Sequence, residues 1–168
     1  MHPYHEYAPM QAEYVQAASN RGDIVKLLDK LKDSTYEFLI QIPRGKASFA
    51  YAEGKWTVKQ VLGHMIDSER IFAYRLLCFS RQEQKELPSF NQEEYVAAFD
   101  YESRSLKSLA DEFKATREAN MYLFNSLTPE QFTLTGSANG YFMTVNGLLY
   151  IIAGHELHHL GILRDRYL

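Results

Sequence analysis

The sequence of 168 residues contains a single cysteine, Cys78, so no disulfide can form within the chain. Scarcity of cysteine is typical of reducing compartments, and we expect a cytoplasmic protein. No apolar run reaches the roughly 20 residues that a membrane-spanning helix requires, which argues against a membrane protein. The first residues show no basic segment followed by an apolar one, so we expect no secretory signal.

Basic residues are not in excess, because 18 Lys and Arg stand against 21 Asp and Glu and give a formal net charge of −3. Phosphate binding requires clustered cations, and no such cluster is visible, so the sequence predicts no nucleic-acid partner. Tyr and Phe lie at helical spacing among Leu and Ile, which indicates core packing rather than base stacking. The length and the hydrophobic fraction of 46% predict one globular domain over residues 1–168.

Strand-like alternation is nearly absent, and helix signals dominate the chain. We expect residues 1–19 to form an irregular N-terminal arm over the rest of the molecule. A first helix is predicted from about Asp23 to Ile42. A second helix opens at the capping box Thr57–Gln60 and continues to about residue 81.

The second half of the chain predicts two more long helices. One covers roughly residues 103–127, and a short helical piece starts near Asn91 ahead of it. Asn139-Gly140 indicates a tight turn, and Thr144 caps the last helix, which continues almost to Leu168. Four long helices predict an all-α four-helix bundle, whose order and handedness these patterns leave open.

Two histidines interrupt the apolar stripe of the last helix. Residues four apart lie above one another on a helix, so His155 and His159 face the same way. A buried ring nitrogen costs free energy unless it is bonded, and one metal ion would serve both rings. His64, in an apolar row of the second helix, is the candidate third ligand, because facing helices of bundles build metal sites in this way.

Three imidazoles accept nickel, zinc or iron, and they leave a coordination position for water or substrate. The alternative is that each ring is a core histidine bonded to a carbonyl or carboxylate. A stacked pair with a third ring on another helix favours the metal. Asp67, three residues after His64, is predicted to orient a ring or to act as a base.

Neighbouring charged residues receive structural roles. We expect Glu69 to form a salt bridge with an arginine, and Glu156 and His158 to point away from the seam toward the surface or an interface. The arginines are expected to form ion pairs rather than to bind an anionic substrate; they are Arg70, Arg75, Arg164 and Arg166.

The segment from His155 to His159 matches the H-E-x-x-H pattern of zinc metalloproteases. The extended protease signature requires glycine and histidine where this chain has Ile162 and Asp165. We therefore do not expect a protease.

The sequence resembles the DinB-like family over essentially its whole length. The resemblance is strongest from Tyr51 to Thr57, from Gly63 to Arg70, from Ala153 to His159 and in the last three residues, Arg166-Tyr167-Leu168. It implies an up-down-down-up four-helix bundle, often a homodimer. It also implies a three-histidine metal site, which maps onto His64, His155 and His159.

The resemblance leaves the reaction open. Members of the wider group are similar to metal-dependent hydrolases, or to transferases and isomerases that use a low-molecular-weight thiol. We therefore expect a metal-dependent enzyme that acts on a small molecule, with a low-molecular-weight thiol as a possible cofactor. The alternative is a non-enzymatic metal-binding stress-response protein, which predicts a closed coordination shell with a fourth protein ligand such as Asp67.

Overall fold

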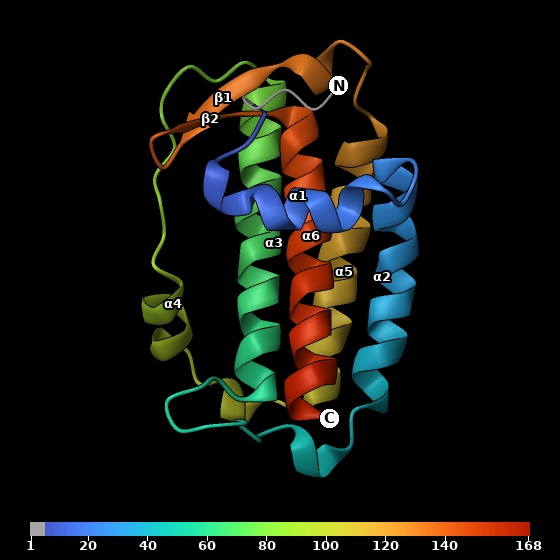
Figure 1. Cartoon of the computed structure of the whole chain (residues 1–168), viewed down its shortest axis with the longest axis vertical. Coiled ribbons are helices and arrows are strands. Elements are labelled where there is room, and N and C mark those ends of the chain that lie inside the picture. Colours follow the sequence, from blue (N-terminus) through green and yellow to red (C-terminus); the bar gives the residue numbers. More distant parts are fainter. Residues whose placement is uncertain (1–5) are drawn as a thin grey trace.

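The structure, a computed structural model, describes residues 6–168. Four long helices lie side by side: α2 (Ile24–Gln41), α3 (Val58–Ser80), α5 (Leu106–Asn125) and α6 (Val145–Ile162) (Figure 1). Helices α2 and α6 run in one direction, and α3 and α5 run in the other. Each helix packs against two others, in the pairs α2–α5, α3–α5, α3–α6 and α2–α6. The predicted four-helix bundle with up-down-down-up topology is confirmed.

Side-chain caps fix the start of each long helix. The side chains of Asp23, Thr57, Ser105 and Thr144 each accept a hydrogen bond from a backbone amide of the first turn. The capping box at Thr57 is complete, because the Gln60 side chain also accepts from the Thr57 amide. These caps satisfy amides that would otherwise lack a partner, and they explain why the sequence located the helix starts.

The expected irregular arm of residues 1–19 is wrong in its second half. A short helix, α1 (Ala12–Ser19), lies across α3 and α6 (Figure 1). Gly154 permits this approach, because a Cβ atom there would lie 1.9 Å from the carbonyl oxygen of Tyr14. Residues 1–5 of the predicted arm lie outside the described residues.

The connections between the long helices contain small elements. A segment with the short helix α4 (Gln92–Ala98) returns the chain from the end of α3 to the start of α5 (Figure 1). Between α5 and α6, the strands β1 (Thr135–Ala138) and β2 (Tyr141–Thr144) pair antiparallel. The predicted tight turn joins them, with positive φ angles at Asn139 and Gly140. No helix within residues 6–168 is long and apolar enough to cross a membrane.

A layer of buried polar side chains divides the bundle core. One apolar cluster gathers the first part of α2, the last parts of α3 and α5 and the first part of α6, and a second cluster gathers the opposite ends. Between them all four helices contribute buried polar residues at the same level: Thr35, His64, Ser68, Glu69, Arg117, His155, Glu156 and His159. Since buried polar groups cost stability unless they are satisfied, this layer is the place to look for function.

Candidate metal centre

Three histidines meet in the polar layer between α3 and α6. The Nε2 atom of His155 lies 3.0 Å from Nε2 of His64 and 3.1 Å from Nε2 of His159. All three side chains are buried, and one ligand atom from each lies within 4.8 Å of the others. The i,i+4 spacing on α6 and the α3–α6 contact therefore bring together the three histidines that the sequence singled out.

Hydrogen bonding between the rings cannot satisfy this arrangement. A neutral imidazole carries one N–H, and Nε2 of His155 faces two other Nε2 atoms but can donate or accept only one bond in the ring plane. Nδ1 of His159 is buried and has no hydrogen-bond partner among the described residues. Three imidazole nitrogens that lie this close together are a donor set that a divalent transition metal prefers.

The distances also suit a metal ion. A metal–nitrogen distance of about 2.0–2.1 Å places tetrahedral ligand atoms about 3.3–3.4 Å apart. The observed separations of 3.0 and 3.1 Å from His155 are slightly shorter. Opening the cluster by a few tenths of an ångström would admit the ion, so the residues present fit the metal that the sequence predicts.

Burial keeps the three rings neutral. It lowers the pKa of His64 to about 4 and that of His159 to about 3, and electrostatic effects of neighbouring histidines add to both shifts. The pKa of His155 falls well below its ordinary value, first through burial and then through the neighbouring histidines. Because a metal binds the unprotonated imidazole, protons do not compete for these rings at neutral pH.

Aromatic side chains surround the histidines. Trp56 lies 4.9 Å from the His64 ring, and its Nε1 donates to Glu93 of α4. Tyr14 of α1 and Phe72 of α3 each meet the His155 ring edge-on at 5.5 Å. The rings are therefore contacted from α1, from the loop before α3 and from α3 itself, about two turns after His64.

Two clefts open beside the histidines. The larger, of about 650 Å³, is lined by His64 and His155 and extends along α3 under α1. The smaller, of about 210 Å³, contains His159 together with aromatic residues of the loop before α3 and the end of the chain. Both clefts are bounded by Gln92 and Glu93 of α4. A small molecule can therefore reach the cluster from two directions.

Asp67 does not take the position that the sequence predicted. Its Oδ2 atom accepts a hydrogen bond of 3.0 Å from the Tyr101 hydroxyl, and it is not part of the histidine group. The Tyr101 ring packs against Gly63, one turn before Asp67 on α3. Partial burial, as the largest influence, raises the pKa of Asp67. The three-residue spacing from His64 turned this carboxylate toward the Tyr101 ring instead.

Glu156 is a second correction, because it is buried rather than at the surface or an interface. Its Oε1 accepts a hydrogen bond of 2.5 Å from the Thr35 hydroxyl, and its Oε2 forms an ion pair of 2.9 Å with Nη2 of Arg117. Burial, partly opposed by this guanidinium, raises the pKa of Glu156. His158, by contrast, is exposed as predicted.

Arg117 joins the four helices at this level. It donates to both carboxylate oxygens of Glu69, at 2.7 and 2.8 Å, which confirms the predicted salt bridge of that residue. It also donates to the Leu28 carbonyl, and Asn120 adds a further bond to Glu69. The sequence reasoning missed Arg117, although its position four residues after Phe113 on the inward face of α5 was a usable signal.

Solved structures with the same fold share little sequence with this chain. YfiT from Bacillus subtilis, described as a probable metal-dependent hydrolase with an unusual four-helix bundle topology, has a TM-score of 0.68 at 18% identity, covering 97% of this chain and 93% of YfiT. A mycothiol-dependent maleylpyruvate isomerase has a TM-score of 0.66 at 10% identity, covering 82% of this chain and 58% of the isomerase. The DinB-like protein YjoA from Bacillus subtilis has a TM-score of 0.59 at 22% identity, covering 84% and 86%.

These identities establish the fold alone, and no curated protein matches the sequence. The family comparison is more specific, because the model of the DinB superfamily matches residues 17–163, which include all three histidines and the four long helices. The chain belongs to the DinB superfamily.

Proposed function

We propose that this protein is a metal-dependent enzyme that acts on a small molecule and holds one divalent ion with His64, His155 and His159. The convergence of three buried Nε2 atoms beside two clefts carries this proposal. When bound, such an ion supplies Lewis acidity, which lowers the pKa of water or of a thiol toward neutrality. Nickel, zinc and iron are the candidate metals, since all three accept imidazole ligands.

The chain's own residues provide binding, orientation and shelter. The larger cleft, at about 650 Å³, has the size of a pocket for a small organic ligand. Tyr14, Trp56 and Phe72 cover the histidine rings and limit the access of bulk water. With only three protein ligands, a bound ion would have room for a further ligand from the clefts, which is typical of reactive rather than structural metal sites.

Hydrolysis is the first candidate reaction, and it requires one small molecule and water. The similar fold of YfiT, a probable metal-dependent hydrolase, supports this candidate by analogy. The presence of two clefts favours a second candidate, group transfer, because that reaction requires two reactants at the same centre. A low-molecular-weight thiol is the proposed second reactant, and the mycothiol-dependent isomerase of similar fold supports it.

A non-enzymatic metal-binding protein would require a closed coordination shell. Asp67 was the candidate fourth ligand for that alternative, and its carboxylate is bound to Tyr101 instead. The clefts beside the histidines also oppose it. We therefore favour the enzyme. Homodimerisation and a cytoplasmic location remain proposals from the family resemblance and from the single cysteine, and sedimentation of the purified protein tests the former.

Elemental analysis of protein purified without a histidine tag tests the metal site. We expect about one divalent ion per chain in the wild type and a loss of it in His64→Ala, His155→Ala and His159→Ala variants. The exposed His158 is the matched control, and His158→Ala should retain the ion. Metal content that is unchanged in all three variants would contradict the proposal.

The reaction is tested by two assays of the metal-loaded protein. A panel of esters and amides reports hydrolysis, and thiols combined with an electrophile report transfer. Activity in either assay should disappear in the three histidine variants and persist in His158→Ala. Activity that survives in the histidine variants would exclude the proposed centre from the chemistry.

A further inference from the structure

Arg75 is a buried cation without an acidic partner. Only 5% of this residue is exposed. Its Nη2 atom donates a hydrogen bond of 2.8 Å to the carbonyl oxygen of Pro88. No carboxylate within residues 6–168 forms a salt bridge with it, which contradicts the ion pair that the sequence predicted. By contrast, Arg70 on the same helix is half exposed and pairs with Glu112.

The Arg75 side chain faces the same cleft as the histidines. It lines the cleft of about 650 Å³ together with His64 and His155. Glu93 is the acidic residue of that lining, and its Oε2 accepts a hydrogen bond from the indole of Trp56. A guanidinium has five N–H donors and keeps its charge at neutral pH even though burial lowers the pKa of Arg75. Most of its hydrogen-bonding capacity is thus unused.

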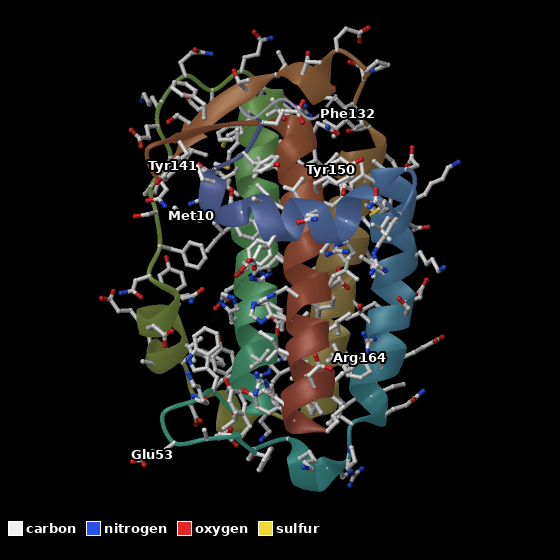
Figure 2. The ribbon with its side chains drawn as sticks, viewed as in Figure 1. Met10, Glu53, Phe132, Tyr141, Tyr150 and Arg164 are labelled. Carbon is white, nitrogen blue, oxygen red and sulfur yellow. The ribbon has the colours of Figure 1, made fainter. Side chains whose placement is uncertain are left out.

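Two further polar groups in the cleft are buried without partners among the described residues. These are Oγ of Ser68, on the α3 face between His64 and Arg75, and Oε1 of Gln11, at the start of α1. Figure 2 shows the neighbouring Met10 at the edge of this cleft, where α1 begins. Unsatisfied buried groups are rare. The Ser68 hydroxyl can donate to an oxyanion, whereas Oε1 of Gln11 accepts and requires a donor elsewhere on the ligand.

We propose that this cleft binds the anionic group of an elongated small-molecule ligand, with the carboxylate, phosphate or sulfonate on Arg75 and the reacting end at the histidines. Only the placement of the reacting end at the histidines rests on the proposed function; the anion site at Arg75 does not. A guanidinium binds a planar or tetrahedral oxyanion through paired N–H donors, which explains arginine rather than lysine here. Eleven residues of α3 separate His64 from Arg75, which corresponds to a rise of about 16 Å. The Arg75 side chain, which leans toward the start of α3 as helical side chains do, shortens the distance that the ligand must span.

Isothermal titration of suberate, an eight-carbon dicarboxylate, and of its neutral diamide tests the proposal. We expect the wild type to bind suberate at least ten-fold more tightly than the diamide, and Arg75→Gln to lose at least ten-fold in suberate affinity. Arg70→Gln is the matched control, because it removes the same charge from the same helix outside the cleft, and it should change the affinity less than two-fold. Equal losses in both variants, or no binding to the wild type, would overturn the proposal.

Two more variants separate binding from folding. Arg75 also supports the loop at Pro88, so Arg75→Gln is expected to lower stability. Arg75→Lys keeps the charge but loses the planar pair of N–H donors, and it should still weaken suberate binding about three-fold or more. Ser68→Ala removes an unsatisfied hydroxyl, so it should leave the melting temperature of the free protein unchanged or raise it, while it weakens suberate binding two- to five-fold. Wild-type affinity in both variants would refute the assignment.

Running each titration on chelator-treated and zinc-loaded protein distinguishes this inference from the proposed function. One outcome is that the protein takes up no zinc but still binds suberate in a way that depends on Arg75. This outcome would refute the metal centre and support the anion site. Zinc uptake that depends on the histidines, with suberate affinity indifferent to Arg75, would refute the anion site alone.

Discussion

Arg117 offers the sharpest test of how the polar layer is held together. Its guanidinium contacts Glu69 through two hydrogen bonds and Glu156 through an ion pair, and all three side chains are at most 3% exposed. We predict that Arg117→Met strongly destabilises the protein. The substitution removes the shared cation while it keeps an unbranched apolar side chain of similar length, so the two carboxylates remain buried without it.

Removing one partner of a buried ion pair costs about 3–5 kcal/mol, mainly because the other charge stays buried. Since two carboxylates lose the same cation here, we expect the upper end of this range, about 4–5 kcal/mol. A domain of this size unfolds with a free energy of about 5–15 kcal/mol, so the variant should approach the limit of stability. The loss should also lower the affinity for zinc, because Glu156 adjoins His155 on α6.

Urea unfolding of chelator-treated proteins at pH 7, followed by circular dichroism, measures this loss. The exposed pair Arg70–Glu112 gives the control, and Arg70→Met should cost only about 0.2–1 kcal/mol. Adding Glu69→Gln and Glu156→Gln to Arg117→Met removes the unpaired charges and should recover at least half of the loss. A cost for Arg117→Met no larger than for the control would show that the network does not stabilise the bundle in this way.

Three further predictions concern the histidines and α1. Zinc should raise the melting temperature of the wild type by several degrees at concentrations well above its Kd and leave that of His64→Ala unchanged, which a thermal scan with and without chelator measures. Chelator-treated protein should lose stability as the pH falls from about 6.5 to about 4. Histidines of the unfolded chain titrate near 6.5, whereas burial lowers the pKa of His64 to about 4 and of His159 to about 3, so the unfolded chain binds more protons in this window. A flat profile of urea midpoints against pH would contradict this prediction. Gly154→Ala should lower the free energy of unfolding by about 1–3 kcal/mol, because the new Cβ atom meets the Tyr14 carbonyl. Gly161→Ala, with open space around the new methyl group, should leave this free energy unchanged or raise it by up to about 1 kcal/mol. Equal urea midpoints for the two variants would refute the contact.

The parts of the fold that the sequence predicted are those set by local chemistry. Thr57 and Thr144 cap helices through residues three positions away, and the i,i+4 spacing alone aligns His155 with His159. The short helix α1 was missed because eight residues carry little periodic signal and its position depends on contacts with α6. The four-residue strands beside Asn139 were missed for the same reason.

Charged residues of the core were harder to place than the histidines. Glu156 and Arg75 carry charges, and charged side chains lie at the surface in most proteins. Glu156 is buried because Arg117 and Thr35, from two other helices, satisfy it. No rule of spacing relates residues 35, 117 and 156, so the contact follows from the packing of the bundle.

The helix α1, which crosses the bundle, contributes to the wall of the larger cleft. The region shared with the superfamily starts at residue 17, whereas Gln11 and Tyr14, which form one wall of the larger cleft, precede it. One side of the larger cleft is therefore formed by residues that precede the matched region. A ligand in this cleft would touch residues of α1 as well as of α3, so the packing of α1 on Gly154 would help to set the shape of the space that the ligand occupies.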